Sequence, residues 1–229
     1  MLSDALGFVK RSDDWVATTI IGGVLSLLSI LIIPAFILQG YYVRAMQAAA
    51  SGDESAPSFT DWGGLLVDGL KLLVVMFGWS LLIVVPMFLF SIVMGVGSTF
   101  VSQAASAPGA APSTAGSLGF GILGMVGMLL VFGLSLVVGY LAPAASANFA
   151  INGTLGAGFD IRTILSGALT GEYAIAWLLA VIVAVVLGTI GSLLTIILVG
   201  IFVMFYVQVT TYYLFARGFA DGVGTQSNW

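Results

Sequence analysis

Apolar residues dominate the chain in five long runs that polar segments separate. A helix needs about 20 apolar residues to cross a hydrocarbon core about 30 Å thick. The runs predict an all-α, polytopic transmembrane helix bundle of about five spans, within a range of four to six. We expect the spans at Val16–Val43, Leu72–Gly97, Leu118–Leu141, Ala174–Leu187 and Leu193–Ala216.

Proline lies in or beside three of these runs, and proline kinks or breaks a helix because it removes a backbone donor and clashes with the preceding turn. Pro86 predicts a bend in the second span, and Pro143 is expected to close the third. The first run contains Pro34 and would be about 40 Å long as one helix. It therefore either tilts and kinks at the proline or re-enters on the side where it began.

Polar and amphipathic segments predict what lies between the spans. Met1–Arg11 and Asp61–Lys71 carry apolar residues at helical spacing, so we expect amphipathic helices in the membrane interface. The sequences Ser12-Asp13-Asp14-Trp15 and Thr60-Asp61-Trp62 are typical of helix starts at an interface. Ser98–Ser117 is uncharged and rich in small residues, and reads as a mobile loop, whereas Gly188–Ser192 predicts a tight turn.

A weak internal repeat is visible in a chain that we interpret as one membrane domain, 1–229. Pro34 followed by Phe59-Thr60-Asp61 resembles Pro143 followed by Phe159-Asp160-Ile161. We place the first repeat at about 12–100, the loop at 98–117, the second repeat at about 118–190, and an extra helix at 193–217.

The basic residues predict the orientation in the cell membrane. Arg44, Lys71, Arg162 and Arg217 fall on one side if the spans alternate, and the positive-inside rule makes that side cytoplasmic. Lys10 and Arg11 fit only if the acidic residues after them neutralise their charge or if the chain re-enters at Pro34.

Composition supports a membrane protein and removes several chemistries. The chain of 229 residues is 60% hydrophobic and 7% charged, with a net charge of −4 and a mean hydropathy of +1.16. It has no cysteine and no histidine, so disulfides, thiol catalysis and the common zinc sites are ruled out. Nucleic acid is not expected as a partner, because binding it needs a basic surface. The acidic, lysine-poor composition indicates a halophilic source.

Polar residues within or at the ends of apolar helices are the candidates for function. For intramembrane polar contacts or lipid contacts these are Gln39, Arg44, Asn148, Asn152, Gln208 and Arg217. Asn148 and Asn152 could satisfy carbonyls freed by Pro143 or take part in permeation. Gln39 and Gln208 could bond to each other. A cluster of Arg44, Arg217, Tyr42 and Tyr213 could hold an anionic lipid headgroup, although snorkelling side chains are the simpler interpretation.

The segment from Gly119 to Gly124 matches a dinucleotide-binding pattern literally, but an apolar helix is the wrong context for it. The spacing of Gly121, Gly124 and Gly127 favours close helix packing instead. We expect no catalytic residue, no metal and no cofactor.

Several segments together resemble the membrane-protein family known as domain of unknown function 4013. They are Ser12–Trp15, Ile32–Phe36, Gly40–Arg44, Asp61–Gly63 with Asp68–Lys71, and Tyr213–Phe215. The family occurs in archaea, many of them halophilic, and in bacteria. The resemblance implies a multi-span membrane protein of unassigned activity, and it supplies no catalytic residues.

The sequence therefore predicts a non-enzymatic structural or accessory component of the membrane. Its expected partners are lipids, and a second copy or another membrane protein. A passive channel or a carrier for a neutral small solute is the alternative, because proline-broken helices paired across a repeat also occur in transporters.

Overall fold

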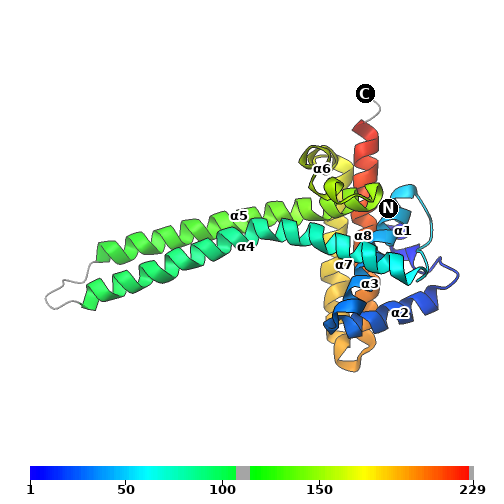
Figure 1. Cartoon of the computed structure of the whole chain (residues 1–229), viewed down its shortest axis with the longest axis horizontal. Helices are drawn as coiled ribbons and strands as arrows, with labels where there is room; N and C mark the ends of the chain where they lie inside the picture. The colour runs from blue at the N-terminus through cyan, green and yellow to red at the C-terminus, as the bar shows by residue number, and fades with distance from the viewer. Residues whose placement is uncertain (107–113, 227–229) are drawn as a thin grey trace. The chain divides into compact units, whose positions relative to one another are not determined.

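A computed structural model describes residues 1–106 and 114–226, and all the regular structure in these ranges is helical. Among the described residues, four helices are long and apolar enough to cross a membrane, which confirms the predicted all-α bundle. In chain order the elements are α1 Leu2–Phe8, α2 Trp15–Leu27, η1 Leu28–Ile30, α3 Ile32–Ser51, α4 Trp62–Ser106, α5 Thr114–Asn152, η2 Leu155–Phe159, α6 Ile161–Ala168, α7 Gly171–Leu194, η3 Thr195–Ile197 and α8 Val199–Gln226 (Figure 1).

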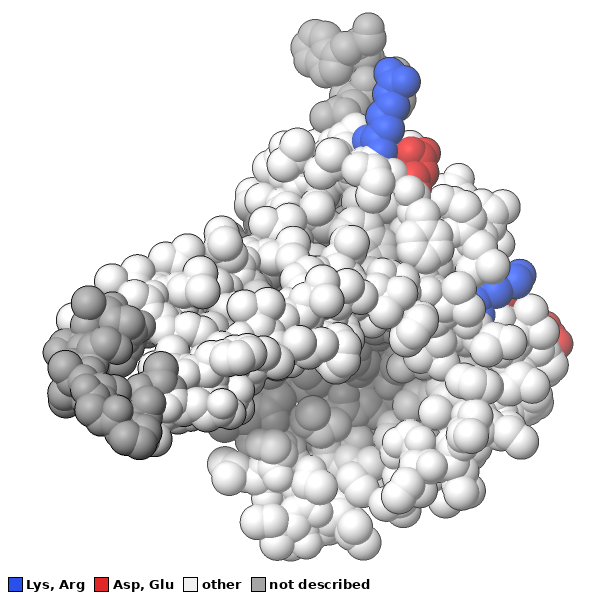
Figure 2. Space-filling model, turned by 60° about the vertical axis from the view of Figure 1, so that its left-hand side comes forward, with Lys and Arg blue, Asp and Glu red and all other residues white. Residues whose placement is uncertain are grey.

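The helices form two compact units. Unit 1 comprises Met1–Met76 and Tyr140–Trp229, and unit 2 comprises Phe77–Gly139. All six basic and ten acidic residues of the sequence lie in unit 1. Figure 2 shows a face on which the charged side chains occupy a few spots and most of the surface carries no charge.

The first expected span, Val16–Val43, is not one crossing. Helix α2 ends at Leu27, and after η1 the chain is extended at Leu31, with φ −86° and ψ 139°. Helix α3 begins at the next residue, so Pro34 lies in its first turn. A proline is tolerated there because the first-turn N–H groups have no intrahelical acceptor. The break therefore lies at Leu31, before the proline. We had expected a kink or a turn at Pro34 itself.

Helices α2 and α3 form a hairpin whose two ends lie together. The chain after α3 returns to the residues before α2: the Ala56 N–H donates to the Phe8 carbonyl at 3.0 Å, and the Ser58 hydroxyl donates to Asp14 at 3.0 Å. From Trp15 to the break the helix rises only about 24 Å, less than the core thickness of about 30 Å. The N-terminus and the segment after α3 thus lie together, an arrangement that the re-entrant alternative requires.

The hairpin of α7 and α8 turns at η3, further along the chain than the predicted turn at Gly188–Ser192. Gly191 and Gly200 face each other across this hairpin, and a Cβ on Gly200 would lie 2.1 Å from the Gly191 carbonyl oxygen. These glycines allow close packing of the two helices and do not make the turn. The turn uses Leu198 at a φ of 62°. Both hairpin tips are apolar and exposed, with Ile30 90% and Ile196 87% exposed.

Helix α8 is the centre of unit 1 and packs against α1, α2, α3, α6 and α7. An aromatic cluster fills the space beside it. Tyr41 stacks on Phe59 at 4.1 Å between ring centroids, Tyr42 lies 5.0 Å from Tyr212, and Phe205 contacts both Tyr41 and Tyr42. In α1 and at its C-terminal end the buried residues are Ala5, Phe8 and Val9.

Helices α3 and α4 cross at two glycines. A Cβ on Gly40 would lie 1.8 Å from the Leu65 carbonyl oxygen, and a Cβ on Gly69 would lie 1.8 Å from the Phe36 carbonyl oxygen. The expected interfacial helix Asp61–Lys71 and the expected second span are one continuous helix here, because no residue between them interrupts the hydrogen-bond ladder.

Unit 2 is a hairpin of α4 and α5, which run side by side (Figure 1). The Phe90 ring lies against Gly127, and the Met94 side chain lies against Gly124. The packing role expected of these two glycines is confirmed, whereas Gly121 faces open space.

Two further expectations need correction. Helix α5 continues through Pro143, so this proline does not close the third span; Pro86, at which a bend was predicted, lies inside α4. The described ends of the expected loop Ser98–Ser117 are helical, because α4 reaches Ser106 and α5 begins at Thr114. Residues 107–113 lie outside the described part of the chain.

Candidate functional site

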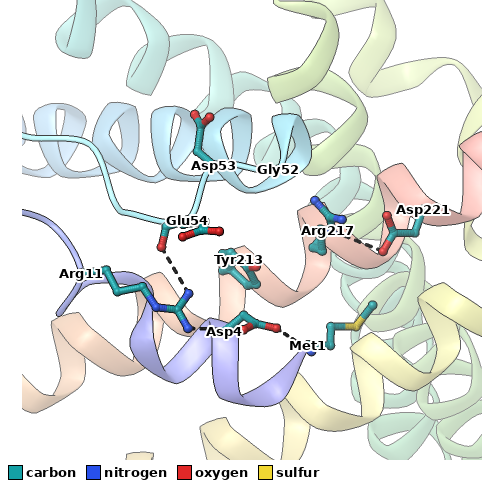
Figure 3. Close-up of a pocket in the computed structure, with 9 residues that line it drawn as sticks. All are labelled: Met1, Asp4, Arg11, Gly52, Asp53, Glu54, Tyr213, Arg217 and Asp221. Atoms are coloured by element: carbon teal, nitrogen blue, oxygen red, sulfur yellow. Dashed lines mark hydrogen bonds and ion pairs between the residues drawn. The ribbon is translucent and has the colours of Figure 1, made fainter.

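A charged pocket of about 460 Å³ lies where three segments of unit 1 meet. Helix α1 and the turn after it contribute Met1, Asp4 and Arg11; the turn after α3 contributes Gly52, Asp53 and Glu54; and α8 contributes Tyr213, Arg217 and Asp221 (Figure 3). The first turn of α1 is acidic because of Asp4, which is favourable at the positive end of a helix.

Most charges in this pocket are paired. The N-terminal ammonium lies 2.8 Å from Asp4, the Arg11 guanidinium lies 3.3 Å from the other oxygen of Asp4, and Arg217 lies 3.3 Å from Asp221. Hydrogen bonds from the N-terminal ammonium and then from Arg11 lower the pKa of the Asp4 carboxyl below its ordinary value. Each of these pairs is largely exposed and lies within one segment, so the pairs contribute little to the packing of α1 against α8.

The turn after α3 is tied to this pocket through its backbone. Arg11 donates to the Glu54 carbonyl at 3.4 Å, whereas the Asp53 carboxylate points away from the Arg11–Asp4 pair (Figure 3). The Phe8 ring lies 4.7 Å from the Tyr213 ring. The pocket thus lies at the base of the hairpin of α2 and α3, where the turn after α1 contacts the turn after α3.

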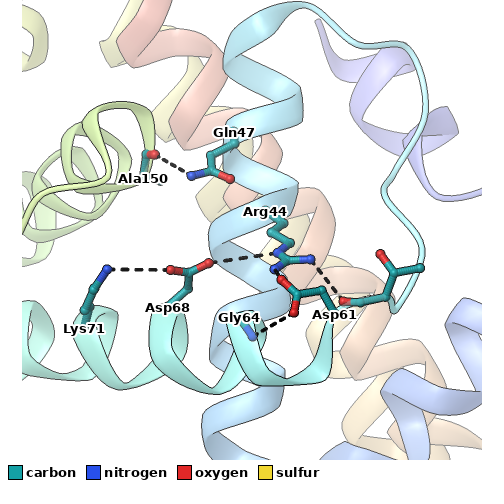
Figure 4. Close-up of polar contacts among 8 residues, drawn as sticks. Arg44, Gln47, Asp61, Gly64, Asp68, Lys71 and Ala150 are labelled. Atoms are coloured by element: carbon teal, nitrogen blue, oxygen red, sulfur yellow. Dashed lines mark hydrogen bonds and ion pairs between the residues drawn. The ribbon is translucent and has the colours of Figure 1, made fainter.

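Arg44 organises a second polar cluster, between α3 and the start of α4. It donates to Asp61 at 2.8 Å and to the Thr60 carbonyl at 3.0 Å, and lies 4.0 Å from Asp68, which also faces Lys71 at 4.0 Å (Figure 4). Asp61 in turn accepts from the Gly64 N–H at 3.2 Å, which caps α4. The hydrogen bond from Arg44, and then that from Gly64, lower the pKa of Asp61.

The expected arginine–tyrosine cluster does not form as one group. Arg44 is engaged by acidic residues of α4, and Arg217 lines the pocket with Tyr213. Tyr42 is buried in the aromatic cluster beside Tyr212. We expected these residues together because they end similar helices. Arg44 instead pairs with Asp61 and Asp68, and Arg217 pairs with Asp221 on its own helix.

Asn148 and Asn152 lie between two cavities of unit 1, of about 450 Å³ and 360 Å³. Both cavities also share Thr163 in their lining. Asn148 is buried and donates to the Ala157 carbonyl of η2 at 2.8 Å, and Asn152 donates to the carbonyl and the side-chain oxygen of Asn148 at 2.9 Å. A structural hydrogen bond was expected here, but its acceptor lies in η2 and not in the turn before Pro143.

Gln47 supplies another amide beside these asparagines. It donates to the Ala150 carbonyl at 2.9 Å and thereby joins α3 to α5 within unit 1 (Figure 4). Asp160 caps α6 by accepting from the Thr163 hydroxyl at 2.6 Å and from its N–H at 3.3 Å. These bonds lower the pKa of Asp160, the hydroxyl having the larger effect.

The predicted bond between Gln39 and Gln208 is wrong. The Gln39 side-chain oxygen is buried without a hydrogen-bond partner among the described residues. Sequence reasoning also missed Asp4, Arg11 and Asp221. Only the fold brings α1 to the end of α8, some 200 positions away, so no local pattern marks these residues as one site.

In the described part of the chain, no three His, Cys, Asp or Glu side chains are placed to hold a metal ion. Most of the polar side chains described above bond to one another or to the backbone. What the arrangement does chemically is to fix helix ends and to close the hairpin of α2 and α3.

The long helices are apolar and expose apolar side chains, and the charged residues are confined to one unit. These features are those of a multi-pass integral membrane protein. Within this class, the model of the family described as Protein of unknown function (DUF4013) matches residues 27–196. The chain belongs to this family, as its resemblance predicted. No curated protein and no solved structure matches the chain.

Proposed function

We propose that this protein is a non-enzymatic structural or accessory component of the cell membrane, which acts through helix–helix and lipid contacts. The observation that supports the proposal is that apolar and polar side chains are used in different places. Apolar side chains cover the surfaces of α4, α5 and α7, while Asn148, Gln47 and Arg44 are used to bond one part of unit 1 to another. Its partners would be lipids and a second copy or another membrane protein.

Purification from native membranes in a mild detergent tests this role. We expect a stable companion, either a second copy or one membrane protein in fixed ratio, to be retained after cross-linking and mass analysis. A monomer that carries no companion and turns over a substrate would refute the proposal.

The proposal includes an orientation, with Arg44, Lys71, Arg162 and Arg217 on the cytoplasmic side. The hairpin of α2 and α3 supports it, because a re-entrant hairpin also puts Lys10 and Arg11 on that side. The absence of cysteine from the sequence allows single cysteines to be introduced without background.

Labelling of such variants in intact cells tests the orientation. Ser55→Cys, in the exposed turn after α3, should react with a water-soluble maleimide only after the cells are opened. Ile30→Cys, at the apolar tip, should not react with it from either side. Labelling of Ser55→Cys from outside would reverse the orientation, and labelling of Ile30→Cys from outside would show that the hairpin crosses.

A passive channel or a carrier for a neutral small solute is the second candidate. The two cavities that share Asn148, Asn152 and Thr163 favour it, because amides and hydroxyls are suited to an uncharged polar solute. Reconstituted liposomes should then show glycerol or urea flux that Asn152→Leu abolishes without unfolding the protein. Flux equal to that of empty liposomes would leave the structural role.

We also infer a halophilic, archaeal source from the acidic composition and the family's range. The charges of the folded protein would then be adapted to high salt. The unfolding temperature in detergent should rise from low to molar KCl, and a fall over that range would contradict this inference.

A further inference from the structure

A groove of about 470 Å³ runs along the outside of unit 1, between α8 on one side and α1 and α2 on the other. Helix α8 presents one face to it, with Val199, Phe202, Val203 and Tyr206 at the i, i+3, i+4 and i+7 spacing of a single helical stripe. The opposite wall consists of two i, i+4 pairs, Leu6 with Lys10 and Trp15 with Thr19.

The groove has one polar end and one apolar end. At the polar end the Tyr206 hydroxyl donates to the Leu6 carbonyl, and Lys10 stands in the turn between α1 and α2. From Tyr206 the groove continues along α8 for about 10 Å to Val199, next to the apolar tip. Phe202 can lie at its floor because it packs on Gly23, where a Cβ would lie 2.2 Å from the ring.

Lys10 is the basic group of this groove, and it is exposed. The ion pairs of the described residues use the N-terminal ammonium, Arg11, Arg44, Lys71 and Arg217, but not Lys10. A cation that takes part in no ion pair of the described residues, at the end of an apolar groove, complements a molecule with an anionic head and an apolar chain. Trp15 beside it is typical of residues that lie at headgroup level.

We propose that this groove is a binding site for one anionic phospholipid, with its phosphate at Lys10 and one acyl chain along the stripe of α8. The site differs from the arginine–tyrosine cluster that the sequence suggested, whose arginines are engaged by acidic residues. It depends on the membrane location of the protein but not on the structural role proposed above.

Native mass spectrometry of the full chain in detergent, with phosphatidylglycerol and phosphatidylcholine of the same acyl chains, tests this site. Phosphatidylglycerol should be retained in preference to phosphatidylcholine. Lys10→Gln should weaken phosphatidylglycerol binding about fivefold, since one lysine near a membrane surface contributes about that factor, and should leave phosphatidylcholine binding unchanged. The matched control is Arg162→Gln, which removes another exposed cation that takes part in no ion pair of the described residues.

A second variant tests the acyl part of the site. Val203→Trp fills the groove and should lower the binding of both lipids, whereas Leu178→Trp, on the exposed face of α7, should lower neither. Glycerol phosphate, which has the head without the chain, should not displace phosphatidylglycerol.

Four outcomes would overturn the proposal. Lys10→Gln could behave like Arg162→Gln, or Val203→Trp could leave the binding of both lipids unchanged. Displacement by glycerol phosphate would show a phosphate site without an acyl groove. Loss of a dimer in Val203→Trp with unchanged lipid binding would show that a second copy of the chain occupies the groove.

Discussion

The crossing of α3 and α4 makes the sharpest prediction for stability. Gly40→Ala would place a methyl group 1.8 Å from the Leu65 carbonyl oxygen, and Gly69→Ala would place one 1.8 Å from the Phe36 carbonyl oxygen. A contact of at least 3.4 Å is ordinary, so the two backbones must move apart by about 1.6 Å. The opposing atoms belong to helical backbones, which cannot turn aside as a side chain can.

The free energy of unfolding should fall by about 2 kcal/mol or more for each variant. Overpacking costs about 1–3 kcal/mol, and a backbone clash belongs at the upper end of that range. Replacing a helical glycine by alanine returns up to about 1 kcal/mol through helix propensity. The double variant should cost less than the sum of the two, because both methyl groups open the same crossing.

Unfolding in dodecyl maltoside micelles titrated with SDS, followed by tryptophan fluorescence, measures this effect. Gly95→Ala is the matched control, since it lies on α4 with no atom within 4 Å of its added methyl group, and it should be neutral or slightly stabilising. If Gly40→Ala and Gly69→Ala unfold at the same SDS fraction as Gly95→Ala, the close crossing is refuted.

Three further predictions concern the polar contacts. A double-mutant cycle of Arg44→Gln and Asp61→Asn should give a coupling of only about 0.2–1 kcal/mol, because the Asp61 side chain is 66% exposed; a coupling several times larger would contradict the exposed geometry. Asn148→Leu should lower the unfolding free energy by about 1–3 kcal/mol, because it leaves the Ala157 carbonyl without its donor, and equal stability in the SDS titration would remove that role. The pKa values of Asp4 and Asp61 are lowered in the folded protein, so the stability that these carboxylates contribute is present above the ordinary pKa of 3.8 and is lost as the pH falls through the lower folded values. When the free energy of unfolding is measured against pH, its decline in acid should be shallower in Asp61→Asn than in the unmodified protein. An unchanged decline would argue against the Arg44 bond.

The long helices could be predicted from sequence because their signal is local. Apolar runs of sufficient length identified them, and the polar residues before Trp15 and Trp62 marked two helix starts correctly. The ends were harder to predict. Glycines near a hairpin suggested a turn at Gly188–Ser192, but in lipid the same residues serve close packing, as Gly191 does against Gly200.

The polar contacts could not be predicted, because their partners are set by the fold. Asn148 was recognised as a structural donor, but its acceptor, Ala157, depends on how η2 folds back. Arg11 and Arg217 line one pocket although 206 positions separate them. Whether Pro34 kinks a helix or begins one likewise depends on the return of the chain to Phe8, which no local pattern specifies.

Unit 2 contains no ionisable side chain at all, since the sequence from Phe77 to Gly139 lacks Asp, Glu, Lys, Arg, His, Cys and Tyr. An electric field acts on a protein segment in proportion to the charge that moves, at about 2.3 kcal/mol per elementary charge and 100 mV. Helices α4 and α5 run in opposite directions, so their dipoles largely cancel as well. Neither voltage nor proton concentration can therefore act on a side-chain charge of this hairpin, and a force on it would come from lipid, from a contacting protein or through its chain connections at Met76 and Tyr140.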